Sequence, residues 1–365
     1  MSAPVDAAPA GRTVFGHPRG LYTLFFTEMW ERFTYYGMRA LLVLFLVDAV
    51  TTGGFGLDDK TATAIYGLYT AAVYLVALPG GWIADRLLGA QRAVWWGGIL
   101  IMIGNALLAI ASDPPLFYTG LVVIILGVGL LKPNISAIVA DLYPEGGGRR
   151  DAGFTVFYMG INLGAFIGPL ITAGLAQAYG WGAGFFSAAV GMGLGLVQFH
   201  LTKHHLLGAG AEPHYRPGED GARIRKRGWR WIIGALIVLA AAIAAGFTGA
   251  LPFDPVTLAR GTTFLIVAMA AGFFVYLLMF AGLDGVERRR IVVVLVLFIA
   301  CALFWSGFEQ AGTSLNLFAE RYTDRFIESI GFEVPAGWFQ SLNPIFILLF
   351  APMFSAIWVG LAKRN

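Results

Sequence analysis

The sequence predicts an all-α polytopic protein that crosses a membrane about ten times. Of the 365 residues, 58% are hydrophobic and only 13% are charged, whereas a soluble domain averages about 25% charged residues. The apolar residues also gather in stretches of about 20, the length that a helix needs to cross the hydrocarbon core of a bilayer. These two observations exclude a water-soluble globular protein.

Ten stretches reach this length, and one long loop divides them. The loop at 202–228 is rich in Gly, Pro and charged residues, which is typical of a flexible linker. We expect a cytoplasmic tail at 1–19, a six-helix bundle at 20–201 and a cytoplasmic linker at 202–228. The predicted spans are 20–48, 62–84, 93–111, 115–140, 152–176, 181–201, 229–249, 261–282, 291–318 and 338–360.

The distribution of Lys and Arg predicts that both chain termini are cytoplasmic, because cytoplasmic loops accumulate these residues. With the N-terminus inside, most of the 25 Lys and Arg residues fall on the cytoplasmic side. This asymmetry explains the pI near 9.0 as membrane orientation, so we expect no nucleic-acid partner. The single Cys301 excludes an internal disulfide and a cysteine-built metal centre. The outer loops hold only Lys60, Arg260, Arg321 and Arg325.

Six ionisable side chains lie inside the predicted spans, three acids and three cations. Each costs at least about 2.5 to 3.5 kcal/mol at the bilayer centre, and the usual reason for such a cost is a substrate or ion path. Architectural ion pairs and side chains that reach to the interface are the alternative explanation. The six residues are Glu28, Glu31, Glu309, Arg32, Arg39 and Lys132.

The first span places its polar residues on one face. In TEMWERFTYYGMR they recur at i, i+3, i+4, i+7, i+8 and i+11, the spacing of one side of a helix. In a membrane such a face must point into the bundle or into a water-filled cavity. A proton arriving at Glu31 would weaken its attraction to Arg32 and free that guanidinium for another anion. The face consists of Glu28, Glu31, Arg32, Tyr35, Tyr36 and Arg39.

Other spans supply single polar and aromatic residues. Lys132 precedes a proline, which removes a backbone donor and makes the helix more deformable there. Asn162 and Asn343 are amides that can donate and accept hydrogen bonds, although one such amide in a span more often joins two helices. Tyr74 and Trp305 can line an aromatic pocket, although a single aromatic residue is more often part of the core.

Six segments carry a resemblance to a known family. Five are EMWERFTYYG at 28–37, GLLKPNIS at 129–136, FYMGINLG at 157–164, FWSGFEQAGTSLNLF at 304–318 and FQSLNP at 339–344. They resemble the signatures of the proton-dependent oligopeptide transporter family of the major facilitator superfamily. The sixth, GGWIADRLLGAQR, resembles that superfamily's cytoplasmic loop motif, which we assign to gating. Its matching residues are Gly81, Asp85, Arg86, Gly89 and Arg92.

This resemblance implies a multi-pass transporter of the cell inner membrane that imports di- and tripeptides with protons by alternating access. It implies no enzyme activity and no cofactor, with protons as the coupling ion. The expected partners are the peptide, protons and the lipid bilayer, and we expect a monomer.

Family roles transfer to this sequence where its residues match. Glu28, Glu31 and Arg32, together with Glu309, resemble the proton-coupling residues. Arg32, Tyr36 and Lys132 resemble the site for the peptide carboxylate, and Glu309 with Arg39 resembles an outer ion pair between the two bundles. Asn162 and Asn343 resemble contacts to the peptide amino terminus and backbone. The implied substrate-binding set is Arg32, Tyr35, Tyr36, Arg39, Tyr74, Lys132, Asn162, Trp305 and Asn343.

The family has twelve core helices, and the resemblance assigns fewer to this chain. It implies an inserted helix pair at 229–282 and the first two helices of a C-terminal bundle at 283–365. The last four core helices are then absent, so we expect weak or no proton-driven uptake from the chain as it stands.

Three rival functions stay open at this point. One is an intramembrane enzyme, although HExxH and GxSxG motifs are absent from the sequence. Another is a truncated binder or sensor that does not transport. The third is a transporter of another small anion such as nitrate.

Overall fold

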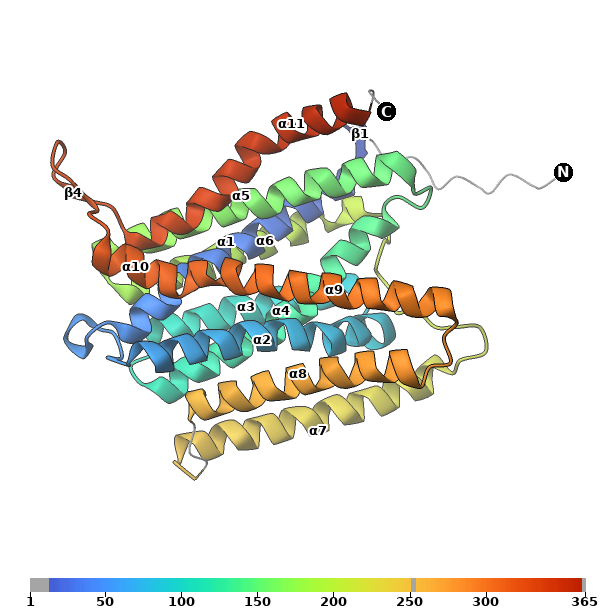
Figure 1. Ribbon diagram of the computed structural model, residues 1–365, viewed down its shortest axis with the longest axis horizontal. Coiled ribbons are helices and arrows are strands. Elements are labelled where there is room, and N and C mark those ends of the chain that lie inside the picture. The colour runs from blue at the N-terminus through green and yellow to red at the C-terminus, as the bar shows by residue number, and fades with distance from the viewer. Residues whose placement is uncertain (1–12, 251–253, 363–365) are drawn as a thin grey trace.

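Six long helices make up the first half of the chain (Figure 1). The computed structural model describes residues 13–250 and 254–362. Local sequence explains several helix starts: Asp58 and Asp113 cap α2 and α4 by accepting a hydrogen bond from a first-turn N–H. The six helices are α1 (Arg19–Val47), α2 (Asp59–Ile83), α3 (Ala90–Ile110), α4 (Pro114–Asp141), α5 (Gly147–Tyr179) and α6 (Trp181–Thr202).

The second half is also helical, with short irregular elements between its long helices. Its helices are α7 (Gly221–Phe247), α8 (Pro255–Met279), α9 (Gly285–Phe308), α10 (Ser314–Tyr322) and α11 (Leu342–Ala362). The 3-10 turns are η1 (Val50–Thr52), η3 (Lys203–Leu206), η4 (Glu309–Gly312) and η5 (Ala336–Ser341), and η2 (Ala84–Leu88) is a π-helical turn. Two short hairpins pair β1 (Thr13–Val14) with β2 (His17–Pro18) and β3 (Phe326–Ile327) with β4 (Phe332–Glu333).

The all-α membrane architecture is confirmed. Within the described residues, nine helical stretches are long and apolar enough to cross a membrane. α1 has 29 residues and is long enough as well, but it carries the buried charges of the polar face. Together these ten stretches match the ten predicted spans. α1 begins and α11 ends at the same end of the molecule (Figure 1), as an even number of crossings requires. The predicted tail at 1–19 and the basic Arg12, Lys363 and Arg364 fall wholly or partly outside the described residues.

Two predicted spans are interrupted in the structure. The span at 291–318 is not one helix, because α9 ends at Phe308 and α10 is a separate helix after η4. The break lies at Thr313, whose φ of −125° and ψ of −103° are not helical, and the Thr-Ser pair there favours turns over helix interiors. The span at 338–360 begins in the 3-10 turn η5, and its α-helix starts at Leu342.

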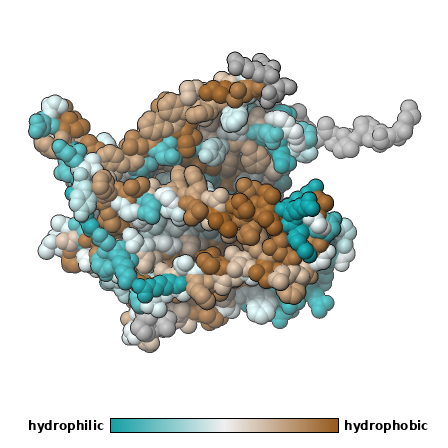
Figure 2. Space-filling model, in the orientation of Figure 1, coloured by the Kyte–Doolittle hydropathy of each residue, from teal (hydrophilic) through white to brown (hydrophobic). Residues whose placement is uncertain are grey.

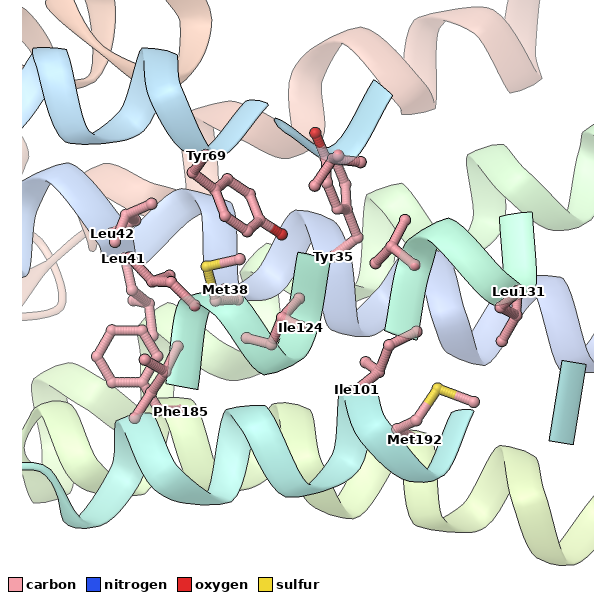
Figure 3. Packing of buried hydrophobic residues seen from close by; sticks show 14 of the residues in the cluster. Tyr35, Met38, Leu41, Leu42, Tyr69, Ile101, Ile124, Leu131, Phe185 and Met192 are labelled. Carbon is pink, nitrogen blue, oxygen red and sulfur yellow. The ribbon is translucent and has the colours of Figure 1, made fainter. Parts of the chain in front are cut away.

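α1 is the central helix of the first bundle, in contact with α5 and α6, while α3 packs on α4 and α6. Glycines permit these close approaches, as small residues do between membrane helices. A Cβ added at Gly164 of α5 would lie 2.2 Å from the carbonyl oxygen of Met29, and one at Gly80 of α2 would lie 1.9 Å from that of Gly129 on α4. Figure 3 shows the apolar side chains that fill the space between the helices.

α7 and α8 lie on the outside of this bundle. α8 contacts α2, and α7 contacts η2 and α4, yet most residues of both helices are exposed. Their exposed side chains are mostly apolar, and contact of these side chains with water would be unfavourable. The brown areas of Figure 2 show such hydrophobic surface across much of the molecule, as expected for helices that face lipid.

The loop predicted as a linker at 202–228 has helical residues at both of its ends. η3 forms its start, and α7 begins at Gly221, because Asp220 caps that helix through the N–H of Arg223. Between them the backbone N–H of His214 donates to the carbonyl of Asp85. The linker therefore packs on the cytoplasmic end of α2.

Candidate functional site

The polar face of α1 is buried in the bundle, as its spacing predicts. Nε of Arg32 lies 3.0 Å from Oε1 of Glu28, one helical turn earlier, and donates to Oε2 of the neighbouring Glu31. All three side chains are at most 5% exposed. The structure thus brings two carboxylates onto one guanidinium inside the membrane-spanning part of the protein.

This cluster has unused hydrogen-bonding capacity. Within the described residues, Nη2 of Arg32, Oε2 of Glu28 and Oε1 of Glu31 are buried and have no hydrogen-bond partner. A buried donor without a partner costs free energy comparable to a lost hydrogen bond. The free edge of the Arg32 guanidinium is therefore suited to an incoming acceptor, and the free carboxylate oxygens to a proton.

Lys132 on α4 supplies a second cation near this cluster. Its side chain is half-buried, and it interacts electrostatically with Arg32, Glu31 and Glu28. Nζ lies 4.3 Å from the centroid of the Tyr74 ring, a cation–π contact. Four charges of balanced sign thus lie within electrostatic reach of one another.

Arg39 and Glu309 form the expected second ion pair. Nη2 of Arg39 lies 3.3 Å from Oε2 of Glu309 in η4, and the same oxygen accepts a hydrogen bond from the hydroxyl of Tyr66 at 3.0 Å. The Arg39 guanidinium also lies over the rings of Tyr36 and Tyr66, at 5.7 and 5.8 Å from their centroids. Sequence reasoning missed Tyr66.

Tyr69 is a second missed residue. Its ring stacks on that of Tyr35 at 6.4 Å between centroids, and Tyr35 in turn lies 5.1 Å below the Arg32 guanidinium. Figure 3 shows Tyr35 and Tyr69 projecting into the same packed region from α1 and α2. The Tyr69 hydroxyl is buried without a hydrogen-bond partner among the described residues. In the sequence, the spacing of Tyr66 and Tyr69 at i and i+3 could have indicated that both tyrosines lie on one face of this apolar helix.

Three predicted residues are not brought into the cluster. Asn162 is buried, and its Nδ2 donates to the carbonyl of Tyr158 in its own helix. Trp305 is 44% exposed and packs on Phe304 and Phe308. Asn343 is exposed at the start of α11. Their assignment to substrate binding stays a prediction.

A second set of contacts closes the outer end of the molecule. Side chains of α10 and η5 donate hydrogen bonds to backbone carbonyls of α1 and α5, so the closure does not depend on charge alone. Arg321 adds a two-armed ion pair to Asp59 at 2.7 and 2.8 Å. The neutral bonds run from Asn316 to Ala40 (2.9 Å), from Trp338 to Leu170 (2.9 Å) and from Ser341 to Phe166 (2.7 Å).

The loop motif is held by the linker. Arg86 in η2 pairs with Glu219, and Nη2 of Arg92 lies 3.5 Å from Oε1 of Glu212. Gly89 provides the turn with a φ of +82°, which favours glycine, and Gly81 and Asp85 lie at the ends of α2 and η2. The N–H of Arg216 and the Arg86 side chain both donate to Glu219 and lower the pKa of its carboxyl.

Comparisons with known proteins identify the family of this chain. The sequence profile described as the POT family matches residues 91–365. The chain is 44% identical over 364 residues to the peptide transporter YePEPT of Yersinia enterocolitica subsp. palearctica, covering 98% of this chain and 70% of that protein. It is 38% identical to a di-/tripeptide transporter of Lactococcus lactis subsp. cremoris, covering 97% and 72%. A crystal structure of peptide transporter POT in complex with sulfate superposes with a TM-score of 0.85 at 42% identity, over 97% of this chain and 71% of that one. This chain belongs to the POT family of membrane transporters.

Proposed function

We propose that this protein imports di- and tripeptides together with protons across the inner membrane by alternating access. Membership of the POT family and the peptide-transporting relatives support the substrate class. The protein would work as a monomer, without a cofactor and without enzymatic chemistry, and protons would be the coupling ion.

The observation that carries the proposal is the buried Arg32 with its unpartnered Nη2 between two carboxylates. Glu28 and Glu31 contribute two negative charges, and Arg32 and Lys132 contribute two positive ones, so the cluster is neutral. A peptide carboxylate adds one negative charge to a buried site, which is costly unless it is compensated. One proton taken up by Glu28 or Glu31 restores neutrality. Peptide binding and proton binding are thereby coupled.

Different side chains bind different parts of the peptide. Arg32 presents a planar donor edge that matches a carboxylate, and Lys132 provides a second positive charge from the opposite helix. Tyr35, Tyr36 and Tyr74 surround these cations and supply apolar area for peptide side chains. At the outer end, a proton on Glu309 would weaken its attraction to Arg39 and release that ion pair.

The test compares a dipeptide with its C-terminal amide. With the purified chain, we expect Lys132→Ala to weaken binding of the free dipeptide at least about tenfold, since a buried charge partner is worth about 1.4 kcal/mol or more. The amide, which lacks the negative charge, should bind equally to the native protein and the variant. Lys203→Ala, which removes an exposed lysine in η3, is the matched control and should change neither.

Two outcomes would contradict the proposal. An equal loss for the acid and the amide would mean that Lys132 does not recognise the carboxylate. Nitrate that displaces the dipeptide at similar concentration would indicate a general anion site, and the substrate class would then be wrong.

A further inference from the structure

Two helices of this protein begin with dense runs of basic residues on the cytoplasmic side. α7 starts with GARIRKRGWRW and α9 with GVERRR. Both starts lie at the same end of the molecule as the start of α1 (Figure 1). We call these residues the basic collar; they are Arg223, Arg225, Lys226, Arg227, Arg230, Arg288, Arg289 and Arg290.

The basic collar is not neutralised by acidic side chains. All eight residues are exposed, and within the described residues none of them forms an ion pair, whereas Arg86, Arg149 and Arg321 elsewhere do. The acids close to the collar in sequence have other partners. Glu219 pairs with Arg86, Asp220 caps α7, and Asp284 forms a capping box with Glu287 at the start of α9.

The collar lies where apolar helix surface begins. Trp229 and Trp231 flank Arg230 of the collar on α7, with exposures of 39% and 70%, and tryptophan is enriched where membrane helices cross the headgroup layer. Exposed apolar residues then continue along both helices. Figure 2 shows the hydrophilic start of α9 directly beside the hydrophobic surface. The unpaired cations are therefore at the level of lipid headgroups.

We propose that the basic collar binds the phosphate groups of acidic phospholipids in the cytoplasmic leaflet. Clusters of four or more Lys and Arg residues directly cytoplasmic to a membrane helix attract anionic headgroups, because the opposite charges meet within a Debye length. Orientation in the membrane alone requires only an excess of cations on this side. The density of the collar, its lack of acidic partners and its tryptophans go beyond that requirement.

The collar joins two parts of the fold. Gly228 of α7 packs against Leu87 and Trp82 at the end of α2, so α7 moves with the first bundle. α9 opens the second group of helices and carries Glu309 directly after its end. Acidic lipid bound to both starts is placed to influence how these two parts move relative to each other. This surface is separate from the Arg32 site and does not depend on the substrate proposed for it.

The test measures lipid retention by the full chain purified in detergent, using phosphatidylglycerol and phosphatidylcholine as probes and native mass spectrometry as the readout. We expect Arg225→Gln/Lys226→Gln/Arg227→Gln and Arg288→Gln/Arg289→Gln/Arg290→Gln each to weaken phosphatidylglycerol binding about tenfold. Arg19→Gln/Arg150→Gln/Lys203→Gln removes three exposed cations from the same side outside the collar, and it should leave binding nearly unchanged. An equal loss in this control, or equal retention of both lipids by the native chain, would overturn the proposal.

A second arm uses only the native chain, so that a misfolded variant cannot obscure the result. Raising NaCl from about 0.1 to about 0.5 M should release phosphatidylglycerol, because exposed charges are screened, and should leave phosphatidylcholine unchanged. Glycerol phosphate at the lipid concentration should not compete. Salt-insensitive binding would refute the collar as an electrostatic surface, and competition by glycerol phosphate would assign it to free phosphate.

Discussion

Arg39 on α1 lies 3.3 Å from Glu309 in the turn after α9, and this ion pair joins the first bundle to the second group of helices. Tyr66 donates to the same carboxylate, so one acidic oxygen serves two partners from α1 and α2. Protonation of Glu309 would remove the charge that holds both. The outer closure thus combines two ion pairs, Arg39–Glu309 and Arg321–Asp59, with several neutral hydrogen bonds.

We predict that Glu309→Gln loosens this closure. In a Cys301→Ser background, a cysteine introduced at Ala336, which is 3% exposed and lies in η5, reports access from outside. Labelling by a membrane-impermeant maleimide should rise about tenfold, as expected if the lost pair is worth about 1.4 kcal/mol. Glu328→Gln changes an exposed acid of the β3–β4 turn and is the control. Unchanged labelling in Glu309→Gln would show that the remaining contacts, the Arg321–Asp59 ion pair and the neutral hydrogen bonds, keep the end closed.

We predict that Glu31→Gln removes the pH dependence of peptide binding. In the proposed coupling, peptide binding to the native cluster takes up a proton, so affinity should fall as the pH rises. With Gln at this position, Glu28, Arg32 and Lys132 carry a net positive charge, and a carboxylate then needs no proton. Dipeptide affinity should therefore be nearly flat between about pH 5 and pH 8. Isothermal titration calorimetry across this range measures the dipeptide affinity at each pH. If the affinity of the variant fell with pH as steeply as that of the native protein, Glu31 would not have this role.

We predict that acid releases the linker from the loop motif. The pKa of the half-buried Glu219 is lowered by the Arg216 N–H and by Arg86. A carboxyl with a lowered pKa in the folded state adds stability above its ordinary pKa near 4.5, and this contribution is lost as the pH falls through the lowered value. Hydrogen exchange of the linker amides, corrected for intrinsic rates, should therefore accelerate below about pH 4. Glu219→Gln should show the fast exchange already at pH 7 and no acid transition.

We predict that Gly164→Ala disrupts the contact between α1 and α5. The added Cβ would meet the Met29 carbonyl at 2.2 Å and Cβ of Arg32 at 2.9 Å, so backbone must move. The expected loss is at least about 2 kcal/mol, at the level of severe overpacking. Gly234→Ala on α7 is the control, because its Cβ would meet nothing within 4 Å. Thermal unfolding of the purified variants separates the two, and equal stability would refute the close packing.

Periodicity predicted the α1 face because all its residues share one helix. The 3.6-residue repeat fixes which side chains point the same way, and Glu28, Arg32 and Tyr35 indeed lie together. The contact between Arg39 and Glu309 was expected only through the family resemblance. Spacing within one helix contains no information about the rotation of another helix.

Because spacing within one helix does not report contacts with other helices, several features of the fold were not predicted. Tyr66 and Tyr69 were missed because two tyrosines one turn apart are a weak signal in an apolar helix. Only the fold places Tyr66 against Glu309 and Tyr69 against Tyr35. The span predicted at 291–318 lies within one membrane-spanning stretch, but its backbone break at Thr313 was not expected, because hydropathy does not register such a break. The linker's order depends on Arg86 and Glu219, which lie far apart in the sequence and meet only in the fold.

The loose attachment of α7 and α8 has a consequence for evolution and for engineering. Residues that touch only lipid are constrained by hydrophobicity and not by shape, so most positions along these two helices should tolerate exchange among Leu, Ile, Val, Ala and Phe. Gly228 is an exception because it touches Leu87 and Trp82. The helix pair is thus a module whose lipid-facing residues can be exchanged without disturbing the Arg32 cluster.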